Sequence, residues 1–237
     1  MQPAFPSVGV ILPAGGKGLR AGSAEPKQFL PLLPGKPMLD FAVEAFSRLD
    51  FVRAIALVLP RERMAAFAGL VLAHPKLKLV EGGAERWISV RNGFQVLDPK
   101  LPYVLVHDVA RPFITQGVIR RCMEALAPDA CVIAAVPSPD TVKEVSEGVV
   151  TRTLDRRGLV LVQTPQVFPR AVLETVYARI WSGDIPTDEA MMAERAGCQV
   201  RWVLGNDSNR KITGATDLAW AQWIASRLNA GETLPDA

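Results

Sequence analysis

Short apolar runs alternate with longer amphipathic segments along most of this chain. The runs that predict strands are Val8–Leu12, Ala54–Leu59, Lys78–Val80, Val104–Val106, Cys131–Val136 and Val200–Leu204. Apolar residues recur at helical spacing in Met38–Arg48, Glu85–Val96, Gln116–Ala127, Arg170–Ser182 and Ala215–Leu228. This alternation predicts an α/β fold in which a mostly parallel sheet carries helices on both faces.

The segment from Pro137 to Phe168 breaks the alternation, because it contains β-like pieces and no convincing helix. "TVKEV" and "VVTRTL" are joined at Glu147-Gly148, which predicts a hairpin. A two-stranded ribbon is marginal alone, so we expect it to pack against another subunit. We therefore expect residues 1–237 to form one domain, with 137–168 as a protruding β-arm that supports a homodimer.

Composition narrows the choice of ligand. The 237 residues are 49% hydrophobic and 22% charged, which fits one globular domain, and the net charge of +3 suits a small anion. Lys and Arg are scattered rather than gathered in a stripe, which argues against nucleic acid. Three widely spaced cysteines predict no disulfide or metal framework and indicate a reducing cytoplasm. The N-terminus does not resemble a signal peptide, and no apolar run reaches membrane-spanning length.

A glycine-rich loop follows the first predicted strand in "ILPAGGKGLRAGSAEPKQFL", residues 11–30. Its backbone can approach a phosphate closely, because glycine has no Cβ. Gly16-x-Gly18-x-x-Ala21 matches the dinucleotide pattern, but prolines from Pro26 onward exclude the helix that this pattern requires. Arg20 and Lys27 could instead neutralise a triphosphate and the charge of its transition state. A surface turn with incidental cations is the alternative.

Two further segments carry candidate chemistry. Asp108 ends the apolar strand of "VLVHDVARPF", where an unpaired buried acid would be costly. It could bind a divalent cation or a substrate hydroxyl, or it could simply pair with Arg111; we expect His107 to be structural. In "VEGGAERWISV", the Gly83 backbone and the Ser89 hydroxyl could read the edge of a base, although a plain strand-to-helix turn is equally compatible.

Six motifs in order resemble the 2-C-methyl-D-erythritol 4-phosphate cytidylyltransferase family, from Val8 to Leu218. They are "PAGGKGLRAG…PKQF", "VEGGAERWISV", "VLVHDVARPF", the pair "PDTVKEV" and "RTLDRRGL", "QTPQVF", and "NRKIT". Ribitol-phosphate cytidylyltransferases share P-K-Q-F and Q-T-P-Q but lack the T-x-D-R-x-G-L wording at Thr153–Leu159. "PTDEAMMAERAG" begins like a helix N-terminus with acids in its first turn.

The resemblance implies a three-layer Rossmann-like nucleotidyltransferase fold, a transfer of CMP from CTP to methylerythritol phosphate, a Mg²⁺ cofactor and a dimer through the arm. It implies that the catalytic residues are Arg20, Lys27 and Lys211. The implied nucleotide contacts are Pro13, Ala14, Gly15, Gly16, Gly18, Gly83, Ala84, Ser89 and Asp108. The implied substrate contacts are Asp108, Arg111, Thr141, Arg156, Thr187 and Lys211, with Asp108 also as the metal ligand.

Two positions depart from the family pattern. Ile88 stands where the family often has Asp, and Ala84 stands where some members have Asp, so any contact with the base must come from the backbone there. Transfer to ribitol 5-phosphate or to a sugar phosphate remains the first alternative. A nucleotide-binding regulatory module without catalysis is the second, and the convergence of Arg20, Lys27, Asp108 and Lys211 argues against it.

Overall fold

A twisted seven-stranded sheet forms the centre of the described chain, which comprises residues 5–16, 25–179 and 186–236 of a computed structural model. The strand order is β11-β7-β10-β6-β1-β4-β5. Every neighbouring pair is parallel except those of β10, which runs antiparallel to both β6 and β7. The predicted mostly parallel sheet is therefore confirmed.

All six predicted strands are present. They are β1 (Val8–Pro13), β4 (Val52–Leu59), β5 (Leu77–Glu81), β6 (Tyr103–Val106), β7 (Ala130–Pro137) and β11 (Gln199–Leu204). The five predicted helices are α1 (Met38–Ser47), α3 (Arg86–Gln95), α4 (Gln116–Glu124), α5 (Arg170–Ala178) and α7 (Ala215–Asn229). The end predicted for the α5 helix, Ser182, lies outside the described residues.

The sequence did not predict several elements. A short β-ribbon is formed by β2 (Pro31–Leu33) and β3 (Lys36–Pro37), and α2 (Ala68–Ala73) is a short helix. The short helix α6 (Glu189–Arg195), by contrast, begins where the sequence predicted a helix N-terminus. The predicted helix N-terminus at Asp188 is confirmed, since its side chain accepts a hydrogen bond from the Met191 amide at 2.8 Å. The largest difference is β10 (Val160–Pro169), which is an inner strand of the central sheet, so the part of the predicted 137–168 arm from Val160 onward belongs to the body instead.

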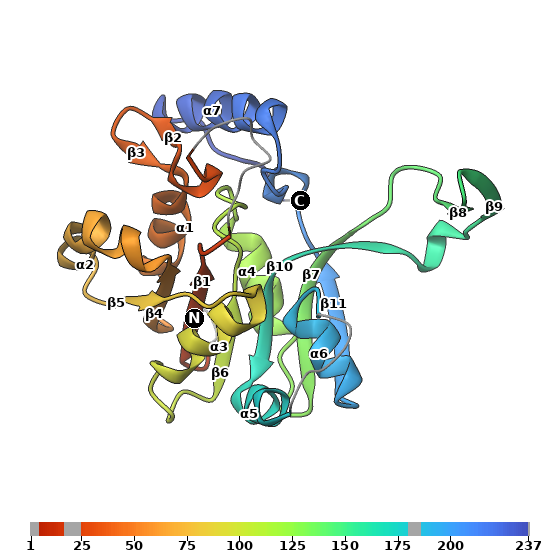
Figure 1. The fold of residues 1–237 in the computed structure, drawn as a ribbon, viewed down its shortest axis with the longest axis horizontal. Helices are drawn as coiled ribbons and strands as arrows, with labels where there is room; N and C mark the ends of the chain where they lie inside the picture. The colour runs from red at the N-terminus through yellow and green to blue at the C-terminus, as the bar shows by residue number, and fades with distance from the viewer. Residues whose placement is uncertain (1–4, 17–24, 180–185, 237) are drawn as a thin grey trace.

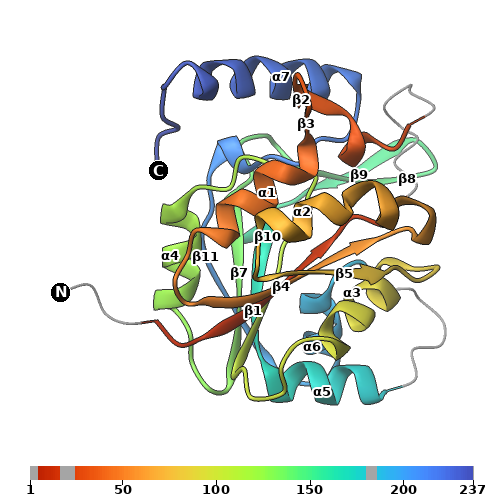
Figure 2. The same ribbon diagram turned by 90° about the vertical axis from the view of Figure 1, so that its left-hand side faces the viewer.

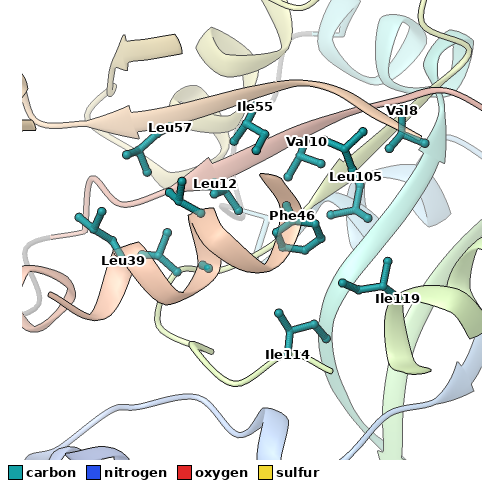
Figure 3. Packing of buried hydrophobic residues seen from close by; sticks show 14 of the residues in the cluster. Val8, Val10, Leu12, Leu39, Phe46, Ile55, Leu57, Leu105, Ile114 and Ile119 are labelled. Atoms are coloured by element: carbon teal, nitrogen blue, oxygen red, sulfur yellow. The ribbon is translucent and has the colours of Figure 1, made fainter. Parts of the chain in front are cut away.

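Helices cover both faces of the sheet. On one face, α1 packs onto β1 and β4, and α4 packs onto β7, β10 and β11. Phe46 of α1 lies near Val10 and Leu105, as Figure 3 shows. On the other face, α3, α5 and α6 enclose a second cluster around Phe168. These clusters define three layers.

A third apolar cluster lies beyond the edge of the sheet, where α7 crosses over the β2–β3 ribbon (Figure 2). It joins Met38, Phe113 and Ile212 to Ala221 of α7. α7 therefore packs against the β2–β3 ribbon and against the segments that follow β6 and β11. Within the described residues, none of the helices has the length and hydropathy that a membrane crossing requires.

The predicted hairpin is confirmed. It consists of β8 (Lys143–Ser146) and β9 (Val149–Thr153), and it projects away from the body in Figure 1. Glu147 and Gly148 turn the chain with φ values of 48° and 81°, and two consecutive positive φ values are typical of a two-residue hairpin loop. Val145, Val149 and Val150 on the arm are exposed.

Candidate active site

A cleft of about 600 Å³ opens where β1 and β6 end. Parallel strands bring their carboxyl ends to one edge, which is where open α/β sheets bind ligands. The cleft is lined by predicted residues from all parts of the chain: Pro13, Ala14, Gly15, Gly16, Lys27, Gly83, Ala84, Ser89, Asp108 and Lys211. Two other predicted residues, Gly18 and Arg20, lie outside the described residues.

The start of the glycine loop is braced by Gln28. Its side-chain amide nitrogen donates to the carbonyls of Ala14 and Gly16, both at 2.7 Å, and Gln28 is almost fully buried. A Cβ at Gly16 would meet no atom of the described residues within 4 Å, so packing against that part of the chain does not explain the glycine there. The open space beside Gly16 is therefore available to a ligand.

Two lysines reach the cleft from opposite ends of the chain. The Lys27 ammonium donates to the carbonyl of Ile212, and this contact joins the glycine loop to the segment that carries Lys211. That segment is itself fixed to the loop after β6, because the Ile212 amide donates to the Ala110 carbonyl at 2.8 Å. Cations separated by 184 positions in the sequence thus line one cavity.

Asp108 lies at the centre of the charged cluster. Lys211 Nζ is 2.7 Å from one carboxylate oxygen, and Arg86 Nη2 is 3.1 Å from the other. Burial by itself would raise the pKa of Asp108, but the positive charges of Arg86 and Lys211 outweigh it and hold the pKa well below its usual range. Asp108 is therefore a carboxylate at neutral pH.

His107 holds the backbone around Asp108. The Asp108 amide donates to Thr164 Oγ1 at 3.1 Å, and that hydroxyl lies 3.1 Å from His107 Nδ1. The carbonyl of Arg111 accepts from His107 Nε2 at 3.0 Å, which assigns the neutral ring with its proton on Nε2. Burial lowers the pKa of His107 to about 4. These contacts agree with the structural role expected for His107.

A second, smaller cavity of about 140 Å³ adjoins the cleft. Arg86, Asp108 and Lys211 line both cavities, so the two meet at this trio. Arg111 and Thr187, predicted to contact a substrate, line the second cavity. The Arg111 guanidinium donates to the carbonyls of Asn209 at 2.9 Å and Val162 at 3.2 Å, which fixes its position.

The segment after β5 is shaped mainly by its own contacts. Ser89 is buried, and its Oγ accepts a hydrogen bond from the Gly83 amide at 3.0 Å. A Cβ at Gly83 would lie 2.6 Å from Ile88 Cβ, so glycine is required there for close packing. Ala84 and Glu85 also line the cleft.

Thr141 and Arg156 lie apart from both cavities, on the arm and its base. Both are exposed, and the Arg156 guanidinium donates to the carbonyl of Pro139. Within one chain, the structure does not bring these two residues to the site.

Sequence reasoning missed Arg86, Gln28 and Thr164 as residues that shape the site. Arg86 stood within "VEGGAERWISV" and Gln28 within "PKQF", but neither segment indicates which carboxylate or carbonyl its side chain meets. Arg86 bridges Asp108 and Glu189, which lies 103 residues away along the chain. No local pattern encodes such a pair.

Together the sheet edge, the glycine loop, the two lysines and the central carboxylate define a nucleotidyltransferase. The family model of 2-C-methyl-D-erythritol 4-phosphate cytidylyltransferase matches residues 8–227. The chain belongs to this family.

Relatives and solved structures support the same family. The 2-C-methyl-D-erythritol 4-phosphate cytidylyltransferase of Syntrophus aciditrophicus is 38% identical over 92% of this chain and 95% of its own. That of Symbiobacterium thermophilum is 41% identical over 92% of each chain. The crystal structure of the Thermus thermophilus enzyme has a TM-score of 0.74 and 31% identity, over 93% of this chain and 99% of its own.

Proposed function

We propose that this protein transfers a cytidylyl group from CTP to 2-C-methyl-D-erythritol 4-phosphate and releases pyrophosphate. The observation that carries the proposal is the pair of adjoining cavities that share Arg86, Asp108 and Lys211. A reaction between two phosphate-bearing molecules requires two anion sites that meet, and the shared cations lie at that junction. Family membership identifies the chemistry that these sites serve.

The larger cavity suits the nucleotide. The backbone from Pro13 to Gly16 lies beside the triphosphate in this assignment, and Lys27 neutralises its charge. Arg20, predicted from the sequence, would add a second cation. Gly83, Ala84 and Ser89 are proposed to lie beside the cytosine ring.

The smaller cavity suits the acceptor phosphate. Arg111 and Thr187 line it, and Lys211 contributes a charge to both halves. A phosphate oxygen of the acceptor attacks the α-phosphorus of CTP, and a new P–O bond forms. The bond from that phosphorus to the oxygen bridging the β-phosphate breaks, and its electron pair leaves with pyrophosphate. The attacking phosphate is ionised near neutral pH, so no general base is required.

The residues present fit a magnesium ion. Asp108 is an ionised carboxylate that lines both cavities, and Mg²⁺ is usually held by one or two carboxylates together with substrate phosphates and water. Among the described residues, no cluster of three or more acidic, histidine or cysteine side chains offers a complete protein cage. A bound Mg²⁺ would neutralise phosphate charge, and Asp108 is the residue proposed to hold it.

A homodimer would give Thr141 and Arg156 a role. Both are exposed on or beside the arm, whose Val145, Val149 and Val150 are also exposed, and an arm that reaches a neighbouring subunit would cover this apolar surface. We assign Thr141 and Arg156 to the acceptor site of the partner subunit. The free thiols of all three cysteines support the reducing cytoplasm as the place of action.

The test is pyrophosphate release by purified protein with CTP and Mg²⁺, using methylerythritol 4-phosphate and ribitol 5-phosphate in parallel. We expect release with the first acceptor. Release with ribitol 5-phosphate alone would overturn the substrate while retaining the chemistry, and silence with both would contradict the proposed reaction. Replacing CTP with UTP or ATP in the same assay tests the base.

A further inference from the structure

Arg86 is the first residue of α3 and lines both cavities. The sequence motifs give it no role, and the proposed reaction treats it only as one of the cations at the junction. Its side chain is 28% exposed, so most of it is enclosed. An arginine in this position presents a planar fork of N–H groups that can hold two acceptors in fixed relative positions. In this structure, Arg86 holds one acceptor on α6 and another after β6.

One acceptor is Glu189, the first residue of α6. Arg86 Nη1 lies 2.7 Å from Glu189 Oε2, and the Glu189 side chain has no exposed surface. Burying a carboxylate costs several kcal/mol unless a cation and hydrogen bonds compensate it. The second oxygen of Glu189, Oε1, has no hydrogen-bond partner among the described residues, so Arg86 supplies the main part of the compensation there. Packing alone gives no reason to retain an acid at this position.

The other acceptor is Asp108. Arg86 Nε and Nη2 lie 3.4 Å and 3.1 Å from the same oxygen, Oδ1, while Lys211 lies on Oδ2. The Asp108 carboxylate is therefore held between two cations on opposite sides. Glu189 fixes the far end of the guanidinium, and this determines which edge of Arg86 faces Asp108.

We propose that Arg86, braced by Glu189, is a positioning residue that fixes the orientation of Asp108 at the junction of the two cavities. Three elements, α3, α6 and the end of β6, are joined through this bridge. The inference rests on the proposed function, since Asp108 matters only if both cavities are used. Arg86 acts through Asp108, and we assign it no direct bond to a reacting atom.

Lysine is the informative substitution. Arg86→Lys keeps the positive charge, but a single ammonium cannot hold Glu189 and Asp108 in the geometry of the fork. A misplaced group of this kind costs up to about 10²-fold in turnover. We expect kcat to fall by about 10²-fold while the KM for CTP changes less than threefold, because the glycine loop and Lys27 are untouched.

The matched control is Arg91→Lys, which makes the same exchange on the same helix. Arg91 lies over the Trp87 ring at 5.2 Å and lines neither cavity, so kcat is expected to stay within twofold. Melting temperatures of both variants separate loss of fold from loss of positioning. If Arg86→Lys fails to fold, Glu189→Gln carries the test, because it retains the shape and an acceptor oxygen but removes the charge.

Two readouts distinguish positioning from general stability. In a cycle of Arg86→Ala, Glu189→Gln and the double variant, the losses in kcat should be strongly non-additive, since both remove one bridge. Guanidinium ion added to Arg86→Ala should restore part of kcat. The inference would be overturned by any of three results: a folded Arg86 variant with wild-type kcat, losses in kcat that are fully additive in the cycle, or no recovery of Arg86→Ala by guanidinium. A wild-type protein that releases no pyrophosphate would instead contradict the proposed function.

Discussion

Replacement of Gln28 by methionine tests whether the glycine loop must be held in place for catalysis. Gln28 is 3% exposed, and its amide donates to two carbonyls on either side of Gly15, each at 2.7 Å. Methionine has a similar length and volume but no donor. Gln28→Met therefore removes both hydrogen bonds while leaving the space filled.

The expected loss of stability follows from these two bonds. A buried hydrogen bond contributes about 1 kcal/mol net, so the loss is about 2 kcal/mol. For a chain of this size, each kcal/mol lowers the melting temperature by about 2–4 °C, so the shift is about 4–8 °C. We expect the loss in kcat to be larger than this loss of stability would suggest, because a displacement of the loop by about 1 Å can lower turnover by about 10²-fold.

The assay is steady-state pyrophosphate release with CTP varied, together with thermal melting of the same samples. Gln222→Met is the matched control, because that amide also donates to a carbonyl, that of Pro31 at 3.1 Å, but on the exposed surface. We expect the control to retain wild-type kinetics. A folded Gln28→Met enzyme with wild-type kcat and wild-type KM for CTP would refute the reasoning.

Three further changes have defined outcomes. Lys27→Ala should lower kcat by at least about 10²-fold, about 3 kcal/mol of transition-state stabilisation, with an unchanged circular dichroism spectrum; normal turnover would contradict its assignment. Gly16→Ala should leave the melting temperature unchanged, because its Cβ meets no atom within 4 Å in the described part of the chain, while raising the KM for CTP; an unchanged KM would mean that no phosphate approaches there. Asp40, whose pKa is raised to about 6 by burial and by Glu44, should disfavour folding once ionised, so the protein loses stability as pH rises from about 4 to about 6. Asp40→Asn should therefore raise the free energy of unfolding at pH 8 by about 1–2 kcal/mol after allowance for screening, seen as a higher urea midpoint, and leave it unchanged near pH 3; an equal gain at both pH values would exclude ionisation as the cause.

The strands that the sequence predicted share one property. β1, β4 and β7 are apolar almost throughout and buried on both faces, as parallel strands covered by helices must be. Their composition alone distinguishes them from surface segments. The same holds for α1, whose apolar stripe packs on the sheet (Figure 3).

β10 was not predicted as an inner strand because its buried half is polar. Gln163, Thr164 and Gln166 are nearly inaccessible to solvent, and residues of these types are ordinarily exposed. Their burial is possible because each finds a partner far along the chain, such as Asp188, whose carboxylate accepts from Gln166 at 2.8 Å. A pattern read locally cannot include a partner supplied by another element.

The residues of the candidate site also fall into those that a local pattern can predict and those that it cannot. The resemblance to family motifs identified many residues that line the cavities, because a ligand determines which types of residue it contacts. It did not identify the buried partners that orient these residues. Arg86 and Glu189 belong to this second group. Glu189 was read only as an acid in the first turn of a helix, which is one of its properties but not the reason for its burial.

Where the two cavities meet, the charged side chains differ in how far they are exposed, and this difference separates their roles. Arg86, Arg111 and Lys211 lie among three acids, Asp108, Asp188 and Glu189, so the formal charges balance and an arriving anion depends on which cation is accessible to it. Lys211 is paired with Asp108 but its side chain is still 42% exposed, so an arriving phosphate can meet its open side without breaking the pair. Arg86 cannot meet a phosphate in this way, because its guanidinium is already paired with both Glu189 and Asp108. A more exposed cation suited to a ligand therefore lies beside a more enclosed one suited to holding the carboxylate, and the exposure of the two side chains, rather than their charge, separates the roles.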